Sequence, residues 1–157
     1  MIVVADTSPL NYLVLISEVE LLPALFGQVL IPQGVFRELQ HLRTPFQVRQ
    51  WIATPPTWLE VRTVASIASP TLLKLDIGER EAIQLALEMG ISTVLIDETD
   101  GRNEARNLCL EVRGTLGILE QAARLGKIDF NTVLNKLAAT NFRISSALRA
   151  ALLKRNS

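Results

Sequence analysis

The chain has 157 residues and carries 16 acidic and 16 basic side chains, so its formal net charge is zero. Apolar residues make up 48% of it and charged residues 20%, which is typical of an ordinary soluble globular protein and predicts a single domain over residues 1–157. The lone cysteine excludes an intrachain disulfide, and no apolar run reaches the roughly 18 residues that a membrane span needs. We therefore expect a reducing, cytoplasmic setting.

Strand and helix segments alternate along the chain, and short β-branched apolar runs are typical of strands buried on both faces of a parallel sheet. In chain order we predict a strand at 2–5, helices at 9–16 and 19–26, a strand at 29–31, helices at 33–43 and 46–53, a weaker edge strand at 58–64, a helix at 78–89, a strand at 93–96, a helix at 103–109, a strand at 111–113, and helices at 115–125, 131–139 and 145–154. Parallel neighbours need helical crossovers, so this order predicts a three-layer α/β/α fold around a mostly parallel sheet of four to five strands.

Two features of the helices guide these boundaries. Ser8 is a good N-cap and Pro9 a good first helical residue. In the segment 33–43, apolar residues recur at helical spacing as far as Leu42. The last two helices are also rich in leucine, and these leucines could either close the core or form a surface for a dimer or another partner.

Acidic residues fall where two predicted strands end. Asp6 follows the first strand and Asp97 follows the strand at 93–96. In open α/β sheets, ligands bind outside the carboxyl ends of the strands. Two further acids, Glu38 beside an apolar stripe and Glu79 in the first turn of a helix, belong to elements that are expected to flank this edge.

Several acids at one place repel one another, so either some of them are protonated or a cation neutralises them. Oxygen-only ligand sets suit Mg²⁺ or Mn²⁺, and such sites serve phosphoryl chemistry. Each acid also has a simpler interpretation: Asp6 as a helix cap, Glu38 as a solvated helix residue, and Glu79 as a favourable charge at a helix N-terminus.

The turn after the strand at 93–96 is crowded with charge. Asp97, Glu98 and Asp100 lie within four positions, and some of them are expected to be surface acids or caps of the next helix. Arg102 and Arg106 follow one helical turn apart, where they could hold phosphates or partner the nearby acids.

The sequence lacks the residue patterns of other common catalytic and nucleotide-binding sites. His41 is the only histidine, and no Ser–His–Asp or Cys–His set can be built around it; we expect an exposed helix residue. Neither GxGxxG nor GxxxxGK[ST] occurs, so dinucleotide and P-loop sites have no phosphate cradle. Trp51 and Trp58 flank a Pro-Pro turn and are expected to pack against neighbours rather than stack on bases.

Four segments in order, VVADTSPL, PQGVFREL, LDIGEREAIQLALEMG and VLIDETDGRNEA, resemble a PIN domain. More narrowly, the Gly-Glu helix and the later segment 114–117 resemble a DUF3368-like subgroup of small prokaryotic proteins, which is similar to the VapC-type toxins of VapBC toxin–antitoxin pairs. The resemblance covers about residues 1–125. It implies a three-layer fold, a Mg²⁺- or Mn²⁺-dependent endoribonuclease, an RNA substrate, a cognate antitoxin protein and a homodimer.

The resemblance also implies site residues. The family's first three acids fall on Asp6, Glu38 and Glu79, with Glu81 a close competitor of Glu79, and its hydroxyl residue after the first strand falls on Ser8. The fourth motif departs from the family's Thr-x-Asp, because an aspartate takes the threonine position and a threonine takes the aspartate position.

The predicted site follows from these correspondences. The predicted metal ligands are Asp6, Glu38, Glu79, Asp97 and Asp100, the first four of which also form the catalytic set, and the predicted substrate-binding residues are Ser8 and Arg102. Two other functions stay open: a catalytically silent PIN-like module that binds a protein or RNA, and a phosphatase with Asp6 as nucleophile. The second is disfavoured, because Ser8 stands where a second acid is expected and no suitable lysine follows Asp97.

Overall fold

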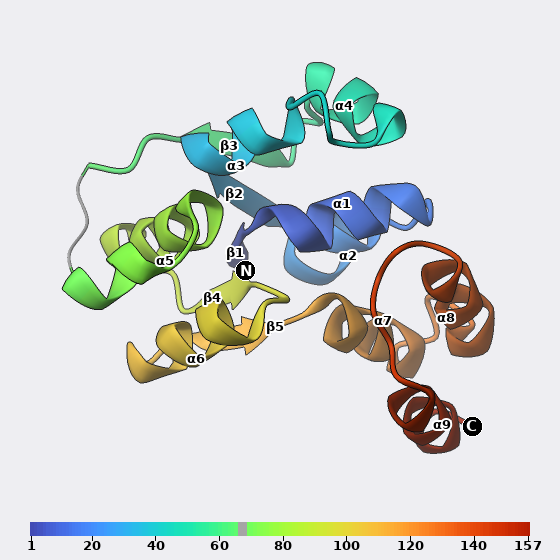
Figure 1. Ribbon diagram of the computed structural model, residues 1–157. Helices are drawn as coiled ribbons and strands as arrows, with labels where there is room; N and C mark the ends of the chain where they lie inside the picture. Colours follow the sequence, from blue (N-terminus) through green and yellow to red (C-terminus); the bar gives the residue numbers. More distant parts are fainter. Residues whose placement is uncertain (66–68) are drawn as a thin grey trace.

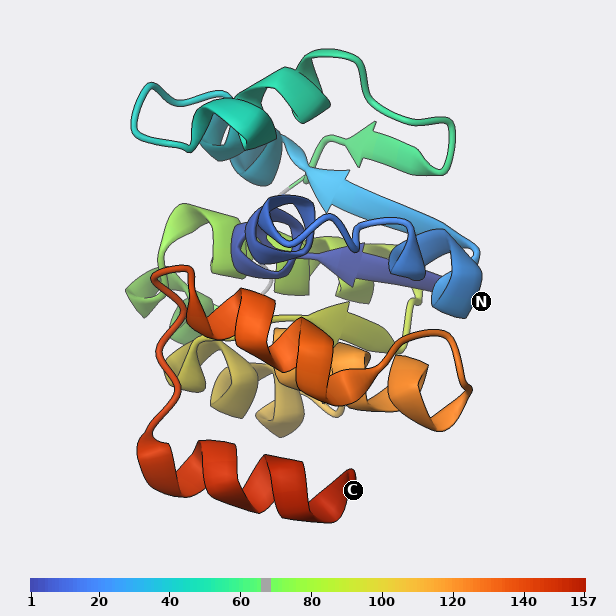
Figure 2. The same ribbon diagram turned by 90° about the vertical axis from the view of Figure 1, so that its right-hand side faces the viewer.

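A computed structural model describes residues 1–65 and 69–157. Within this described part, five parallel strands form one sheet in the order β3-β2-β1-β4-β5, and helices cover both of its faces (Figures 1 and 2). The predicted three-layer α/β/α fold is confirmed. The strands are β1 (Ile2–Ala5), β2 (Gln28–Pro32), β3 (Leu59–Arg62), β4 (Thr93–Leu95) and β5 (Glu111–Arg113).

The predicted helices occur in the predicted order with their ends shifted by up to four residues, and the structure adds a short 3₁₀ helix that is not among the predicted elements. They are α1 (Thr7–Leu15), α2 (Leu21–Phe26), α3 (Gln33–Leu39), α4 (Phe46–Ala53), the 3₁₀ helix η1 (Pro70–Lys74), α5 (Ile77–Met89), α6 (Thr99–Asn107), α7 (Thr115–Arg124), α8 (Phe130–Ala138) and α9 (Ser146–Arg155). Among the described residues, none of these helices combines the length and the apolar character needed to cross a bilayer.

The three central strands, β2, β1 and β4, are buried on both faces, as their apolar runs predict, whereas the edge strands β3 and β5 are partly exposed. Val3 and Ala5 of β1 pack into one core cluster with α1, α2, α7 and α8, whereas Val4 packs into the other with α5 and α6. This alternation follows from the two-residue period of a strand. Each fully buried apolar side chain of this size contributes about 1.5–3 kcal/mol, so the two clusters hold the layers against the sheet.

The order of the strands places the two acid-ended strands side by side. The chain builds β1, β2 and β3 in one direction and then returns to add β4 on the free side of β1. The backbone N–H of Asp6 donates to the carbonyl of Leu95 at 2.9 Å, which fixes the ends of β1 and β4 next to each other. The point at which the strand order reverses is the usual ligand site of such sheets, and Asp6 and Asp97 flank it.

Several predicted helix ends are wrong, among them the start of α1, the end of α3 and the start of α6. Helix α1 starts at Thr7 with Asp6 as its N-cap residue, because the Ser8 hydroxyl donates to a distant carboxylate instead of capping the helix. Helix α3 stops at Leu39, and Leu42 is 84% exposed beyond it. Helix α6 starts at Thr99, four residues before the predicted start.

The C-terminal leucines close the protein's own core. Leu134, Leu137 and Leu152 are buried in the cluster beside α1 and α7, whereas Leu148 is 41% exposed. Helix α9 is also held by two hydrogen bonds from Arg155 to the carboxylate of Glu120. The tryptophans pack on each other as predicted, with ring centroids 6.0 Å apart.

Candidate active site

Two carboxylic acids are buried at the carboxyl edge of the sheet. Asp6, directly after β1, and Glu79, in the first turn of α5, are each only 5% exposed. Glu79 reaches this position because Asp76 caps α5: its Oδ1 accepts a hydrogen bond of 2.9 Å from the Glu79 backbone N–H. Asp76 and Glu79 thus have the spacing of a capping box, and the cap orients the first turn of α5 toward the sheet edge.

Three exposed acids surround the buried pair. Glu38 projects from α3, Asp76 from the start of α5, and Glu98 from the residue before α6. These three acids, together with Asp6, line a cavity of about 470 Å³. Elements that are distant in the sequence therefore deliver acids to one place, as the sequence predicts for Asp6 and Glu38.

The environment of the cluster opposes ionisation of its buried members. Burial raises the pKa of Asp6 to about 8, with a further increase from Asp76, Glu38 and Asp97, and only the Thr7 backbone N–H opposes this rise. Burial raises the pKa of Glu79 to about 9, with contributions from Asp76, Asp6 and Glu98. Both groups are therefore largely protonated at neutral pH when no cation is bound.

The pKa of Glu38 is also raised. Burial raises its pKa and Asp76 adds to the rise, while the Thr7 hydroxyl and His41 oppose it. His41 is exposed, as predicted, but it lies beyond the end of α3 and not in a helix, and it lines the cavity together with Arg43.

The cluster has the chemical character of a divalent-cation site. Among the described residues, the buried Glu79 Oε2 has no hydrogen-bond partner, although buried polar atoms usually have one. No lysine or arginine is among the groups that shift the pKa of Asp6 or Glu79. A hard divalent ion would supply both the missing partner for Glu79 and the missing positive charge, and its ligands would be oxygens of the kind it prefers.

The carboxylates are not gathered as tightly as bound ligands would be. Within residues 1–65 and 69–157, no group of three histidine, cysteine, aspartate or glutamate side chains lies close enough together to enclose an ion. Binding of an ion would therefore require side chains of the cluster to move closer together.

Asp97 is held differently from the other acids. Its Oδ1 accepts from the Thr115 backbone N–H at 2.6 Å, and its Oδ2 accepts from the hydroxyls of Ser8 at 2.6 Å and Thr115 at 2.7 Å. These bonds tie the end of β4 to the first turns of α1 and α7. Asp97 thus satisfies the N-terminus of α7 and orients the hydroxyl of Ser8, whose predicted role in substrate binding stays a prediction.

Glycines provide the space in which the acids lie. A Cβ on Gly78 would lie 2.7 Å from Asp6 Oδ1 and 3.1 Å from Glu38 Oε2, so this turn of α5 passes directly against both carboxylates. A Cβ on Gly101, in the first turns of α6, would collide with Glu79 Oε2. The Gly-Glu pair at the start of α5 thus has a physical reason: the glycine makes room for the partners of the glutamate.

We expect Gly78→Ala to disturb the acids while keeping the fold. Alanine normally stabilises a helix by about 1 kcal/mol relative to glycine, but here its methyl group would push the Asp6 carboxylate away. We expect weaker Mn²⁺ binding, measured by calorimetry, and little or no gain in thermal stability. Gly117→Ala in α7 is the matched control, since its Cβ would contact nothing within 4 Å and should stabilise the fold without changing Mn²⁺ affinity. Equal Mn²⁺ affinity in the two variants would contradict this interpretation.

Other predicted residues lie outside the cluster. Asp100 is exposed in the first turn of α6 and lines a separate cavity with Lys74 and Asn103. Glu81 is engaged elsewhere, since its Oε1 accepts from the Gly34 backbone N–H at 2.8 Å. The structure thus brings Glu79, and not Glu81, to the acids. Arg102 donates to the carbonyl of Ile96 at 3.4 Å and lies beside Gly114, away from the buried pair.

Two residues near the cluster were missed by sequence reasoning. Asp76 belongs to the cluster, and its signal was present: an acid three residues before Glu79 is the pattern of a helix cap. Arg143, in the segment between α8 and α9, lines a neighbouring cavity. No local pattern could have placed it there.

Comparison with known proteins agrees with this architecture. A model of the DUF3368 family, described as a PIN domain, matches residues 2–157 and therefore also covers α8 and α9, beyond the segments that carry the resemblance in the sequence. No curated protein and no solved structure matches the chain. PIN domains are typically nucleases that use divalent metal ions. With its parallel sheet and its acids at the carboxyl edge, the chain belongs to the PIN-domain family.

Proposed function

We propose that this protein is a Mg²⁺- or Mn²⁺-dependent endoribonuclease that hydrolyses RNA phosphodiester bonds. The observation that carries the proposal is the pair of buried acids, Asp6 and Glu79, which have further acids around them and whose pKa values no lysine or arginine of the described residues lowers. Burying carboxylates without a neutralising charge is energetically unfavourable, and a bound cation would offset this unfavourable free energy.

Each acid has its own place in this proposal. Asp6, Glu38 and Glu79 would hold the ion, and Asp76 lies close enough to their charges to take part. A bound Mg²⁺ or Mn²⁺ would supply Lewis-acid polarisation of the phosphate and activation of water. Asp97, with its oxygens already accepting from Ser8 and Thr115, fits a positioning role better than that of a direct ligand.

The proposal is tested by comparing two glutamates of the same helix. In Glu79→Gln we expect cleavage of single-stranded RNA in Mn²⁺ to fall strongly. The fall should exceed the roughly 10–100-fold loss that is typical when a residue that only orients a metal ligand is replaced. Glu81→Gln is the matched control, because its amide oxygen can still accept from the Gly34 N–H and should leave cleavage within a few-fold of the original chain. Equal cleavage by both variants, or cleavage that survives EDTA, would reject the proposal.

A catalytically silent PIN-like module that binds RNA or a protein is the second candidate. It is favoured by the hydrogen bonds that occupy Asp97 and by the absence, among the described residues, of three acids close enough to enclose an ion. Tight Mn²⁺ binding with no turnover of any RNA, across varied sequences, would select this candidate.

Membership of the PIN-domain family also suggests a role for the protein in the cell. We infer a VapC-like toxin with a cognate antitoxin protein, acting as a homodimer, on the strength of the family alone. Toxicity on expression that is lost in Glu79→Gln, together with a dimer in sedimentation measurements, would support it.

A further inference from the structure

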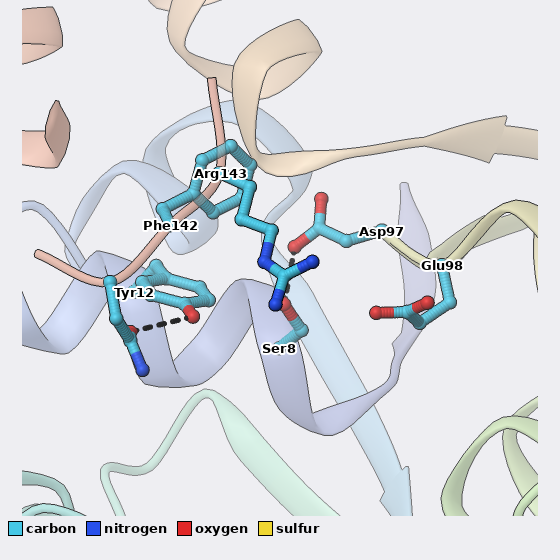
Figure 3. Close-up of a pocket in the computed structure, with 7 residues that line it drawn as sticks. Ser8, Tyr12, Asp97, Glu98, Phe142 and Arg143 are labelled. Carbon is cyan, nitrogen blue, oxygen red and sulfur yellow. Dashed lines mark hydrogen bonds between the residues drawn. The ribbon is translucent and has the colours of Figure 1, made fainter. Parts of the chain in front are cut away.

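A short segment between α8 and α9, residues 141–143, runs along one side of the molecule, beside a cavity that adjoins the candidate active site (Figures 2 and 3). Its position is fixed by Tyr12 of α1. The Tyr12 hydroxyl donates to Asn141 Oδ1 at 2.8 Å, and the Tyr12 and Phe142 rings meet edge to face with centroids 4.9 Å apart. We call residues 141–143 the C-terminal strap.

The strap presents an arginine to a cavity. Phe142 and Ile144 pack against the core, so the residue between them, Arg143, faces outward as expected for extended backbone. Figure 3 shows its guanidinium in the space between Tyr12 and the carboxylates of Asp97 and Glu98. This cavity has a volume of about 720 Å³.

The guanidinium of Arg143 is free. Among the described residues it makes no ion pair and no hydrogen bond, whereas the neighbouring arginines are engaged: Arg102 with the Ile96 carbonyl, Arg113 with Gln121, and Arg155 with Glu120. An exposed arginine held by packing on both sides of it, yet without a partner, is suited to an anionic ligand that arrives from solution.

The cavities around Arg143 lie in series. The cavity of the strap shares Ser8, Tyr12 and Glu98 with the cavity of the acid cluster. On its other side it shares Asp97, Phe142 and Arg143 with a third cavity that also contains Arg102, Arg113 and Arg155. This row leads from the acids that would hold the metal to a surface rich in arginine. A linear polyanion could follow it with one phosphate at the acids and the next beside Arg143.

We propose that Arg143 binds a backbone phosphate of single-stranded RNA adjacent to the bond that is cut. The inference rests on the nuclease function proposed above for the identity of the polymer, but the phosphate contact itself needs no catalysis. It assigns to the C-terminal strap a role in positioning the substrate.

The test measures binding separately from cleavage. Fluorescence anisotropy with a labelled single-stranded RNA, in EDTA, gives the Kd of the original chain, Arg143→Gln, Arg143→Lys and the control Arg149→Gln, whose arginine bonds to Asn135 on α8. We expect Arg143→Gln to raise the Kd about tenfold and to flatten the slope of log Kd against log salt by about 0.7, the value of one phosphate contact on a single strand. Arg143→Lys should retain most of the slope, and Arg149→Gln should change neither quantity.

The outcomes separate this inference from the proposed function. RNA affinity that depends on Arg143, without cleavage in Mn²⁺, would uphold the phosphate contact and reject the nuclease. Cleavage with an unchanged Kd, slope and KM in Arg143→Gln would do the reverse. The inference would be overturned if the original chain bound no RNA, or if Arg143 were needed for binding a poly-glutamate peptide and not for binding RNA. Unchanged thermal melting of the variants excludes a folding defect.

Discussion

Replacing Asp6 by asparagine is expected to abolish metal-dependent RNA cleavage and, at the same time, to stabilise the metal-free protein. Activity should be lost because the amide removes one of the two buried acids of the cluster. Stability should rise because the Asp6 pKa of about 8 in the folded protein lies well above its ordinary value of 3.8. At pH 7 the unfolded chain gains from ionising this group and the folded chain does not, and each pH unit between the two pKa values is worth about 1.4 kcal/mol.

This opposite response of activity and stability distinguishes a functional acid from a structural one. RNA cleavage in Mn²⁺ and denaturant unfolding in EDTA measure the two effects on the same preparations. Asp129→Asn is the control, since Asp129 caps α8, far from the cluster, and its hydrogen bonds to Thr132 lower its pKa. That variant should cleave RNA normally and should gain no stability. An Asp6→Asn protein that is both active and less stable would contradict the site.

The metal-free protein is expected to lose stability as the pH rises from about 4 to about 9. Asp6 and Glu79 have raised pKa values, about 8 and about 9, so the folded state holds protons in this range that the unfolded state has released. The stability is therefore fully present below the unfolded pKa values, near 4, and is lost as the pH rises through the folded ones. Each group that stays protonated only in the folded state contributes a slope of at most about 1.4 kcal/mol per pH unit.

A divalent ion should reverse this dependence. Binding requires ionised carboxylates, so Mn²⁺ displaces the protons and stabilises the protein more at pH 8 than at pH 5. Melting temperatures across this range, in EDTA and in Mn²⁺, measure the effect. Calorimetry at pH 7 in two buffers with different ionisation enthalpies should detect the release of about one to two protons per ion, and fewer from Glu79→Gln. A melting temperature in EDTA that rises with pH would contradict the prediction.

The fold could be predicted from local patterns because each pattern has a local cause. The buried strands were visible as β-branched apolar runs, and the acids Asp6 and Asp97 were visible because a parallel sheet brings strand ends to one edge. The predicted start of α1 was wrong because a side chain at a helix start can serve a distant partner, whereas nothing in the structure explains the earlier start of α6. Ser8 donates across 89 positions to Asp97.

The remaining parts of the site depend on tertiary structure. The choice between Glu79 and Glu81 is made by the Gly34 N–H, which takes Glu81 across 47 positions. The strap reaches the site through Tyr12 and Asn141, which are 129 positions apart. Asp76 is a different case: the Asp-x-x-Glu spacing of residues 76–79 is a local capping pattern, and it does not by itself show that the cap belongs to the acid cluster.

The close approach of Gly101 to Glu79 couples the residues that these two positions can accept. The glutamate arm lies in the volume that any larger residue at 101 would need. An alanine there should be tolerated only beside a shorter acid, so the pair Glu79→Asp with Gly101→Ala should retain function that Gly101→Ala alone destroys. In related chains, these two positions should therefore covary, with a shorter acid at position 79 wherever position 101 carries a residue larger than glycine.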